Sequence, residues 1–286
     1  GAETVPKTDI EWATHSLNPI LGCSLVSEGC RNCYAMARAH LTEHNPAVHD
    51  VDYFLAGETE VTNGHPYAGL TTDARKWSGE LHYIPNRVDE IARWTKPRPR
   101  VFVGSMSDVF HESAPLRWIS EIMAAVRERP DSSFLFLTKR PERLLEWQAY
   151  MGGDFPHDHV WPPNAWIGVS VENQETADVR IPILSRVRAR VKWLSMEPLL
   201  GPVDLAPFLL HTVALGPDRR ALADSVPDIA WVVVGGESGP GARPMEPEWA
   251  RDLRDQCVAQ DTPFFFKQMT KKGTIPPDLL VREFPR

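Results

Sequence analysis

The chain has 286 residues, of which 42% are hydrophobic, and can bury a large core as one α/β barrel or as two smaller domains. Its net charge of −7 at pH 7 argues against a protein whose whole surface binds nucleic acid, although a local basic channel is still allowed. No apolar run is long enough to span a bilayer and the first residues are polar, which predicts a cytoplasmic protein with neither a signal peptide nor a membrane partner.

A short strand is predicted over residues 8–14, and it leads into a loop that contains three of the four cysteines. Cys23, Cys30 and Cys33 are spaced C-x6-C-x2-C, whereas Cys257 is far away in the chain. A disulfide would leave one of the three unused, and a structural zinc site usually needs four ligands in two pairs. Three thiolates fit a cluster or metal ion that keeps one coordination position open, and a reducing compartment would keep them free to bind it.

Other interpretations of this cysteine loop are open at the level of the sequence. The thiols could bind zinc together with a histidine, they could act as a redox-sensing trio, or they could be buried simply as small apolar side chains. Four histidines are near enough in the sequence to complete such a zinc site: His15, His40, His44 and His49.

The next part of the chain is predicted to contain one helix and one irregular segment. A helix is expected over residues 34–41, because this stretch is rich in alanine and has no helix breaker. From residue 45 to residue 77 the sequence is dominated by Gly, Pro, Asp, Thr and His, without a recognisable period. We therefore expect residues 45–77 to form an irregular insertion or lid.

After this segment, short apolar strands mostly alternate with helices. Because the strands are apolar at nearly every position, both faces of each should be covered, as in a parallel sheet. With the first strand there are about eight strands, which predicts a single α/β domain over residues 1–286 with a (β/α)8-type, TIM-like barrel, complete or partial. An open doubly wound sheet is the alternative. The strands are expected at residues 80–84, 100–104, 133–137, 165–169, 191–194, 229–234 and 264–266, and the helices at 86–94, 116–127, 141–150, 174–185 and 247–259.

Polar side chains follow almost every predicted strand. Because the carboxyl ends of parallel strands meet at one rim, we expect these side chains to form one site together with the cysteine loop. The three glutamates of the group could accept hydrogen bonds from an ammonium group or ribose hydroxyls, and its cations could bind a carboxylate or phosphate. A buried salt bridge to a basic residue across the barrel mouth is the alternative role for Asp108 and Glu197. The group consists of Ser105, Ser107, Asp108, Lys139, Arg140, Glu172, Glu197, Glu237 and Lys267.

Several blocks of the sequence resemble a family of uncharacterised proteins from bacteria and their phages that is noted for a three-cysteine motif. The resemblance covers nearly the whole chain apart from residues 45–77. That family is regarded as similar to radical S-adenosylmethionine (SAM) enzymes. The blocks that carry the resemblance are residues 18–34, 105–112, 137–143, 168–174, 197–202, 235–244 and 264–268.

The resemblance implies that Cys23, Cys30 and Cys33 ligate a [4Fe–4S] cluster whose open iron binds SAM. Reduction by an electron donor would then cleave SAM to a 5′-deoxyadenosyl radical that abstracts hydrogen from a substrate. The chain departs from the usual radical-SAM pattern, because the first cysteine gap has six residues instead of three. We assign the remaining site residues as cofactor-binding (Asn18, Tyr34, Ser105, Ser107, Glu172, Glu197 and Glu237) or catalytic (Asp108, Lys139, Arg140 and Lys267).

The expected activity is therefore radical chemistry on a nucleic acid or nucleotide substrate, for modification or repair. The phage association and the basic residues of the rim favour such a substrate. The alternative is a non-catalytic iron–sulfur or zinc protein that binds nucleic acid or senses redox state, and zinc-dependent hydrolysis is a third interpretation. This activity would also need an electron donor, and the sequence does not identify any further protein partner.

Overall fold

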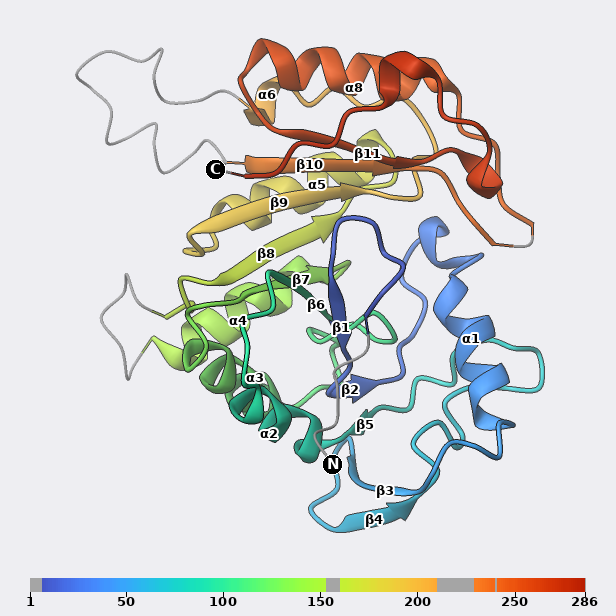
Figure 1. The fold of residues 1–286 in the computed structure, drawn as a ribbon, viewed down its shortest axis with the longest axis vertical. Helices are drawn as coiled ribbons and strands as arrows, with labels where there is room; N and C mark the ends of the chain where they lie inside the picture. The colour runs from blue at the N-terminus through green and yellow to red at the C-terminus, as the bar shows by residue number, and fades with distance from the viewer. Residues whose placement is uncertain (1–6, 153–159, 210–228, 240, 286) are drawn as a thin grey trace.

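Seven parallel strands form the main sheet of the computed structural model, which describes residues 7–152, 160–209, 229–239 and 241–285. Their order, β1–β6–β7–β8–β9–β10–β11, follows the chain, and the sheet curls into a half-barrel (Figure 1). Among the described residues the end strands β1 and β11 are not paired with each other. The strands are β1 (His15–Leu17), β6 (Arg100–Val103), β7 (Ser133–Thr138), β8 (Ala165–Ser170), β9 (Val191–Met196), β10 (Ile229–Gly235) and β11 (Phe264–Gln268).

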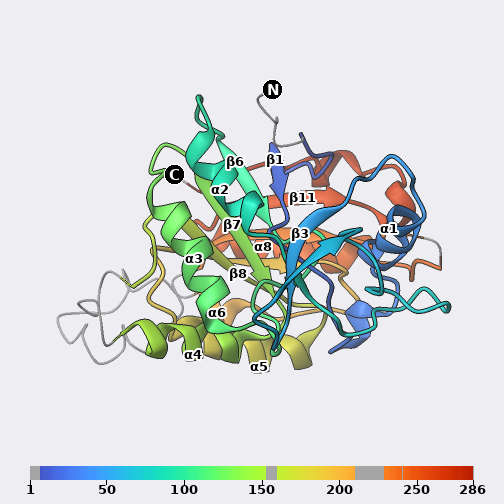
Figure 2. The ribbon, with the colours of Figure 1, turned by 90° about the horizontal axis from the view of Figure 1, so that it is seen from below.

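Helices cover the convex face of the curled sheet (Figure 2). Proline opens α2, α4 and α8, where its fixed φ suits a first helical turn and its missing N–H is not needed. The predicted bounds of α3, α5 and α8 are confirmed to the residue. The helices that follow the strands are α2 (Pro85–Arg93), α3 (Leu116–Arg127), α4 (Pro141–Met151), α5 (Gln174–Ser185), α6 (Ala206–Leu209) and α8 (Pro247–Ala259), and the short 3-10 turns near the end of the chain are η3 (Thr270–Lys272) and η4 (Pro277–Leu279).

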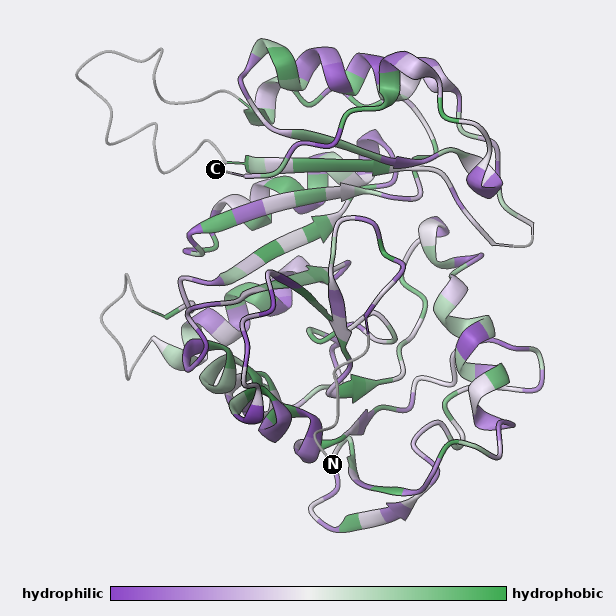
Figure 3. Ribbon diagram, viewed as in Figure 1, coloured by the Kyte–Doolittle hydropathy of each residue, from purple (hydrophilic) through white to green (hydrophobic). Residues whose placement is uncertain are grey.

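The main sheet is buried on both faces, as its continuous apolar strands predicted. Side chains of a strand alternate between faces, so that Val101 and Val103 of β6 pack under the helices while Phe102 points into the half-barrel. On the inner face, Trp12 packs edge-on against Phe102, with ring centroids 4.7 Å apart, and also against Trp193. Figure 3 shows the strands mostly in the colours of hydrophobic residues. The half-barrel is therefore filled at its centre by aromatic rings.

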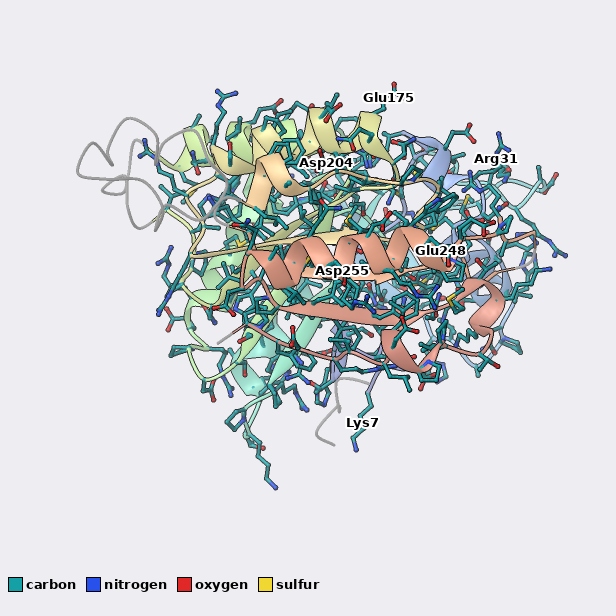
Figure 4. The ribbon with its side chains drawn as sticks, turned by 90° about the horizontal axis from the view of Figure 1, so that it is seen from above. Lys7, Arg31, Glu175, Asp204, Glu248 and Asp255 are labelled. Atoms are coloured by element: carbon teal, nitrogen blue, oxygen red, sulfur yellow. The ribbon has the colours of Figure 1, made fainter. Side chains whose placement is uncertain are left out.

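Charged side chains lie on the outer surface of helix α8. On α8, Glu248 and Asp255 are exposed on the side turned away from the sheet (Figure 4), whereas Leu253 and Cys257 of the same helix are buried. This pattern is that of an amphipathic helix packed on a sheet. None of the helices in the described part of the chain is long and apolar enough to cross a membrane.

A second, antiparallel sheet of four strands corrects the prediction for residues 45–77. The segment contains a hairpin of β3 (Val51–Leu55) and β4 (Val61–Gly64), which joins β5 (His82–Tyr83) and β2 (Ile20–Leu21) in the order β2–β5–β3–β4. Tyr53 is the only buried residue of the two hairpin strands. Because the other residues of these strands are exposed or only partly buried, the sequence does not need to alternate between apolar and polar residues. The hairpin is formed through pairing with β5, which a local pattern does not reveal.

Two predicted strands of the barrel were also wrong. The segment predicted over residues 80–84 forms β5, which belongs to the small sheet, and the first strand of the main sheet lies at His15–Leu17 instead of residues 8–14. Trp12, which lies in the segment predicted as the earlier strand, is 2% exposed because it packs inside the half-barrel. The main sheet consequently has seven strands instead of about eight.

Candidate functional site

A cavity of about 210 Å³ lies at the carboxyl ends of the parallel strands. Two predicted site residues, Asn18 and Glu172, do not line it, but both hydrogen-bond to residues around it. All other predicted site residues line this cavity: Cys23, Cys30, Cys33, Tyr34, Ser105, Ser107, Asp108, Lys139, Arg140, Glu197, Glu237 and Lys267. The structure therefore brings together side chains that are up to 244 positions apart, from Cys23 to Lys267.

The cysteine loop runs from the small sheet to helix α1 (Tyr34–Glu43). It begins at Gly22, whose φ is 93° and where a side chain would collide with the backbone of Glu80, so that glycine is required. A single turn, η1 (Glu28–Cys30), is followed by Cys33, which is the N-cap residue of α1 and donates its backbone N–H to the carbonyl of Cys30 at 3.2 Å. All three loop cysteines are free thiols and are half-buried.

Arg140 holds the first part of the loop against the ends of β6 and β7. Its guanidinium donates to Asp108 at 3.0 Å and to Ser24 Oγ at 2.7 Å, and it forms an ion pair with Glu112. Its Nη1 atom is 3.8 Å from the sulphur of Cys23. Burial alone would lower the pKa of Arg140, but the charge of Asp108 and the other acidic neighbours outweigh it, and the net shift is upward. The guanidinium therefore stays charged.

Asp108 is used to fix the ends of these two strands. Its carboxylate accepts hydrogen bonds from the backbone of Phe110 at 3.0 Å, the hydroxyl of Thr138 at 2.9 Å and the backbone of Lys139 at 3.2 Å, besides the contact with Arg140. The side chain is 6% exposed. Both carboxylate oxygens are thus occupied by protein donors, which is the buried salt bridge that the sequence left open for this residue.

Glu172 holds the middle of the cysteine loop from the end of β8. One of its carboxylate oxygens accepts from Ser27 Oγ at 2.9 Å and forms ion pairs with Lys139 at 3.3 Å and Arg180 at 3.1 Å. Burial acts to raise the pKa of Glu172, but the positive charges of Lys139 and Arg180 lower this pKa by more than burial raises it. The net shift of the pKa is therefore downward. The residue is 1% exposed and lies directly beneath Gly29 of the loop.

Glu237 holds the last part of the loop from the end of β10. Its carboxylate accepts from the side chain of Asn32 at 3.0 Å and from the backbone of Arg243 at 2.7 Å, and it forms an ion pair with the Arg243 guanidinium. Arg243 also donates to the carbonyl of Glu28 at 2.9 Å. The cysteine loop is therefore fixed at three points by charged residues that follow β7, β8 and β10.

One ion pair of the cavity does not contact the loop. Lys267 of β11 donates to Glu197 Oε1 at 2.6 Å, and the side chain of Gln268 approaches the same oxygen at 3.3 Å. The side chains of Glu197 and Lys267 are 20% and 15% exposed, and both line the cavity. This pair can therefore reach a bound molecule with both signs of charge.

Two buried polar groups at the cavity have no hydrogen-bond partner among the described residues. They are the hydroxyl of Ser107 and the indole N–H of Trp12, and both side chains line the cavity. A buried polar group without a partner is costly, by about 1–3 kcal/mol, and is usually satisfied by water or by a ligand. The two groups are consistent with a polar molecule in this cavity.

Asn18 positions the rim of the cavity without lining it. Its side-chain oxygen accepts from Ser105 Oγ at 3.1 Å and from the backbone of Met106 at 2.9 Å, while the hydroxyl of Tyr34 donates to the carbonyl of Ser105 at 2.8 Å. Asn18 itself lines a neighbouring cavity of about 600 Å³, which shares Tyr34, Ser105 and Lys267 with the first.

The histidines proposed to complete a zinc site lie away from the thiols. His40 and His44 are at the far end of α1, about 10 Å or more along the helix axis from Cys33 at 1.5 Å per residue. His49 lies beyond this helix and His15 opens β1. A zinc ion with Zn–S bonds of about 2.3 Å would hold three sulphurs within about 4 Å of one another. Among the described residues, the one group of three or more potential metal ligands within 4.8 Å of one another lies on α1 and does not include the thiols.

The two innermost thiols are hard to ionise without a bound metal. Burial raises the pKa of Cys23 to about 12, with a further contribution from the charge of Asp108, and burial also raises the pKa of Cys33. These thiols are therefore protonated near neutral pH. Because metals bind the thiolate form, any metal bound by these residues would displace their protons.

Sequence reasoning missed several residues that hold the cysteine loop. Arg180 lies inside a predicted helix and reaches Glu172 from there, so that nothing in the local pattern indicates its role. His111 and Glu112 were noted among the polar residues after the predicted strand at 100–104, but not their contacts with the loop: His111 is 1% exposed and places Nε2 2.8 Å from Ser24 Oγ, 87 positions away. The other missed residues are Ser24, Ser27, Asn32 and Arg243.

Comparison with known proteins gives a family and no function. A family model that is described as a protein of unknown function, DUF5131, matches residues 7–276 of the chain. No curated protein and no solved structure matches the chain. The matched region extends from the residues before β1 to the segment after β11, and so includes the cysteine loop and every strand end around the cavity. The chain belongs to the DUF5131 family of proteins of unknown function.

Proposed function

We propose that the protein is an iron–sulfur enzyme of the radical-SAM type, in which Cys23, Cys30 and Cys33 bind a [4Fe–4S] cluster and the adjoining cavity binds SAM. The observation that supports it best is the convergence of three free thiols from one loop on a cavity with unsatisfied polar groups. We interpret the half-barrel as a partial TIM-like barrel, because such folds place their sites at the carboxyl ends of the strands.

The donor set suits a cluster better than a single ion. Three thiolates leave one iron of a four-iron cluster without a protein ligand, whereas a structural zinc ion would need a fourth ligand, and the nearby histidines of α1 lie at the far end of that helix. When bound, such a cluster would supply the one-electron reduction that cleaves SAM, given an electron donor. The role of the protein is to hold the thiols, bind SAM and exclude water.

Three side chains would fix the thiols, and a second set would bind SAM. Arg140, Glu172 and Glu237 hold the cysteine loop, so their role is positioning. Glu197 would accept from the ammonium group of SAM and Lys267 would donate to its carboxylate, which matches the two signs of their ion pair. The free hydroxyl of Ser107 and the indole N–H of Trp12 would supply further hydrogen bonds.

The neighbouring cavity favours an anionic substrate such as a nucleotide or a nucleic acid strand. It adjoins the first cavity at Tyr34, Ser105 and Lys267, so that a substrate there would lie next to bound SAM. Its cationic side chains outnumber its acidic ones. The cations are Lys7, Arg38, Arg87, Lys267 and Lys272, and the acids are Asp9, Glu11 and Glu90.

Anaerobic turnover tests this proposal. Protein reconstituted with iron and sulfide, reduced with dithionite and given SAM should form 5′-deoxyadenosine and methionine, which are measured by mass spectrometry. Cys30→Ala should abolish both products, whereas Cys257→Ala should retain them, because Cys257 is fully buried on α8 away from the cavity. If the iron-loaded wild type forms neither product, the enzyme proposal is wrong and the non-catalytic alternative replaces it.

A further inference from the structure

A group of three metal-ligating side chains lies on helix α1, outside the cavity. His40, Glu43 and His44 have ligand atoms that all lie within 4.8 Å of one another, and no other such group occurs among the described residues. Their spacing of three and four residues places them on one face of the helix. The imidazole rings of His40 and His44 lie side by side, with centroids 4.9 Å apart.

The hydrogen bonds of both histidines leave the same ring nitrogen free to bind a metal. The Nδ1 atom of His44 is 2.8 Å from the backbone carbonyl of His40, which can only accept, so this nitrogen carries the proton. The hydroxyl of Thr71 donates to Glu43 Oε2 at 3.4 Å and therefore accepts from His40 Nδ1 at 3.1 Å. In both rings Nε2 then carries the lone pair.

The carboxylate of the group is also held in place. Glu43 Oε1 accepts from the backbone N–H of Gly69 at 2.9 Å, and its second oxygen is fixed by Thr71. Histidines that bind metals usually donate their other ring N–H to a carbonyl or a polar side chain, which sets the orientation of the ring. His40 and His44 have this arrangement in the structure.

We propose that His40, Glu43 and His44 bind one divalent transition-metal ion, with zinc as the favoured ion, through the two Nε2 atoms and the carboxylate. Two imidazoles and one carboxylate are a ligand set for zinc that leaves a fourth position for water. The ion would link the end of α1 to residues 69–71 of the loop beside it. It is distinct from the thiol site, which lies at the opposite end of the same helix.

The test is a zinc titration of the whole chain, with stoichiometry measured by equilibrium dialysis and metal analysis. The thiols can bind zinc as well, so the decisive quantity is the difference between variants. Wild type and His49→Ala should each bind one equivalent more than His44→Ala, since His44 and His49 are both exposed but only His44 belongs to the group. Equal stoichiometry in all three proteins would overturn the proposal.

A second variant tests the arrangement instead of the ligands. Thr71→Val keeps the shape of the side chain but removes the hydroxyl that orients His40 and Glu43, and should weaken the same equivalent of zinc by about 10–100-fold. Cobalt bound at this site should show ligand-field bands without a thiolate charge-transfer band. An unchanged affinity in Thr71→Val, or a thiolate band that disappears in His44→Ala, would contradict the assignment.

Discussion

The backbone of Gly29 lies directly against the carboxylate of Glu172, so that a Cβ atom at position 29 would be 2.5 Å from Oε1 and 2.6 Å from Cγ of Glu172. These atoms cannot move freely, because the same carboxylate is held by Ser27, Lys139 and Arg180. The cysteine loop thus approaches the strand ends as closely as a residue without a side chain allows. This contact joins the loop to the charged network beneath it.

Gly29→Ala should therefore displace the loop. We expect a loss of about 1–3 kcal/mol in the free energy of unfolding, which is typical of overpacking in a well-packed site. We also expect a lower iron content after reconstitution. Gly201→Ala is the matched control, since a Cβ atom there meets nothing within 4 Å, and its effect should stay within about 0.5 kcal/mol. Urea denaturation measures the free energy of unfolding of both variants. Equal losses in Gly29→Ala and Gly201→Ala would contradict the close contact between the loop and Glu172.

Arg140→Lys should destabilise the protein although it keeps the charge. The guanidinium binds Asp108, Ser24 and Glu112 at once, and a lysine ammonium cannot reproduce this fork. Weakening a buried ion pair leaves Asp108 poorly compensated, and removal of one partner of such a pair costs about 3–5 kcal/mol, which is the upper limit here. Arg251→Lys is the control, since its guanidinium binds Glu248 and Asp278 at the exposed surface, and it should change stability far less than Arg140→Lys. Arg140→Lys behaving like this control would show that the contact is dispensable.

Ionised Glu237 should contribute to the stability of the folded protein, and this contribution should be lost at acidic pH. Burial acts to raise its pKa, but the hydrogen bonds from Arg243 and Asn32 outweigh it, and the net shift is below the ordinary value of 4.5. A carboxyl group with a lowered pKa in the folded state stabilises the protein fully above its unfolded pKa, and this contribution is lost as the pH falls through the folded pKa. Glu237→Gln should thus flatten the decline in Tm below about pH 4.5. An unchanged acid limb would mean that Glu237 does not take part.

Substitutions of the Glu197–Lys267 pair should separate SAM binding from cluster binding. Glu197→Gln and Lys267→Met should each weaken SAM binding by about 10–100-fold, which corresponds to a charged hydrogen bond of about 1.5–3 kcal/mol. Iron content should not change, because neither side chain contacts the cysteine loop. Lys271→Met, at an exposed position, is the control. Isothermal titration of the reconstituted protein with SAM measures the affinity. A loss of iron in Glu197→Gln or Lys267→Met would instead give the pair a role in holding the cysteine loop, like that of Arg140, Glu172 and Glu237.

The sequence was sufficient to predict the parallel α/β layers and the rim of the site. Strands such as Ile229–Gly235 are apolar on both faces, which is a local signal, and their parallel order places the polar residues after them at one rim. Residues 45–77 were mispredicted because the hairpin there is held by β5 and not by its own apolar pattern. The roles of Asp108 and Glu172 as anchors of the structure depend on partners that lie elsewhere in the chain, such as Arg140 and Arg180, and could not be inferred from strand ends alone.

The most direct test of the central claim is the count of iron and acid-labile sulfide in anaerobically reconstituted protein, with Cys30→Ala and Cys257→Ala measured alongside. We predict about four irons and four sulfides per chain in the wild type and in Cys257→Ala, and a large loss of both in Cys30→Ala. Stoichiometric zinc without sulfide at the thiols, or an iron content that does not depend on Cys30, would contradict a cluster held by the cysteine loop.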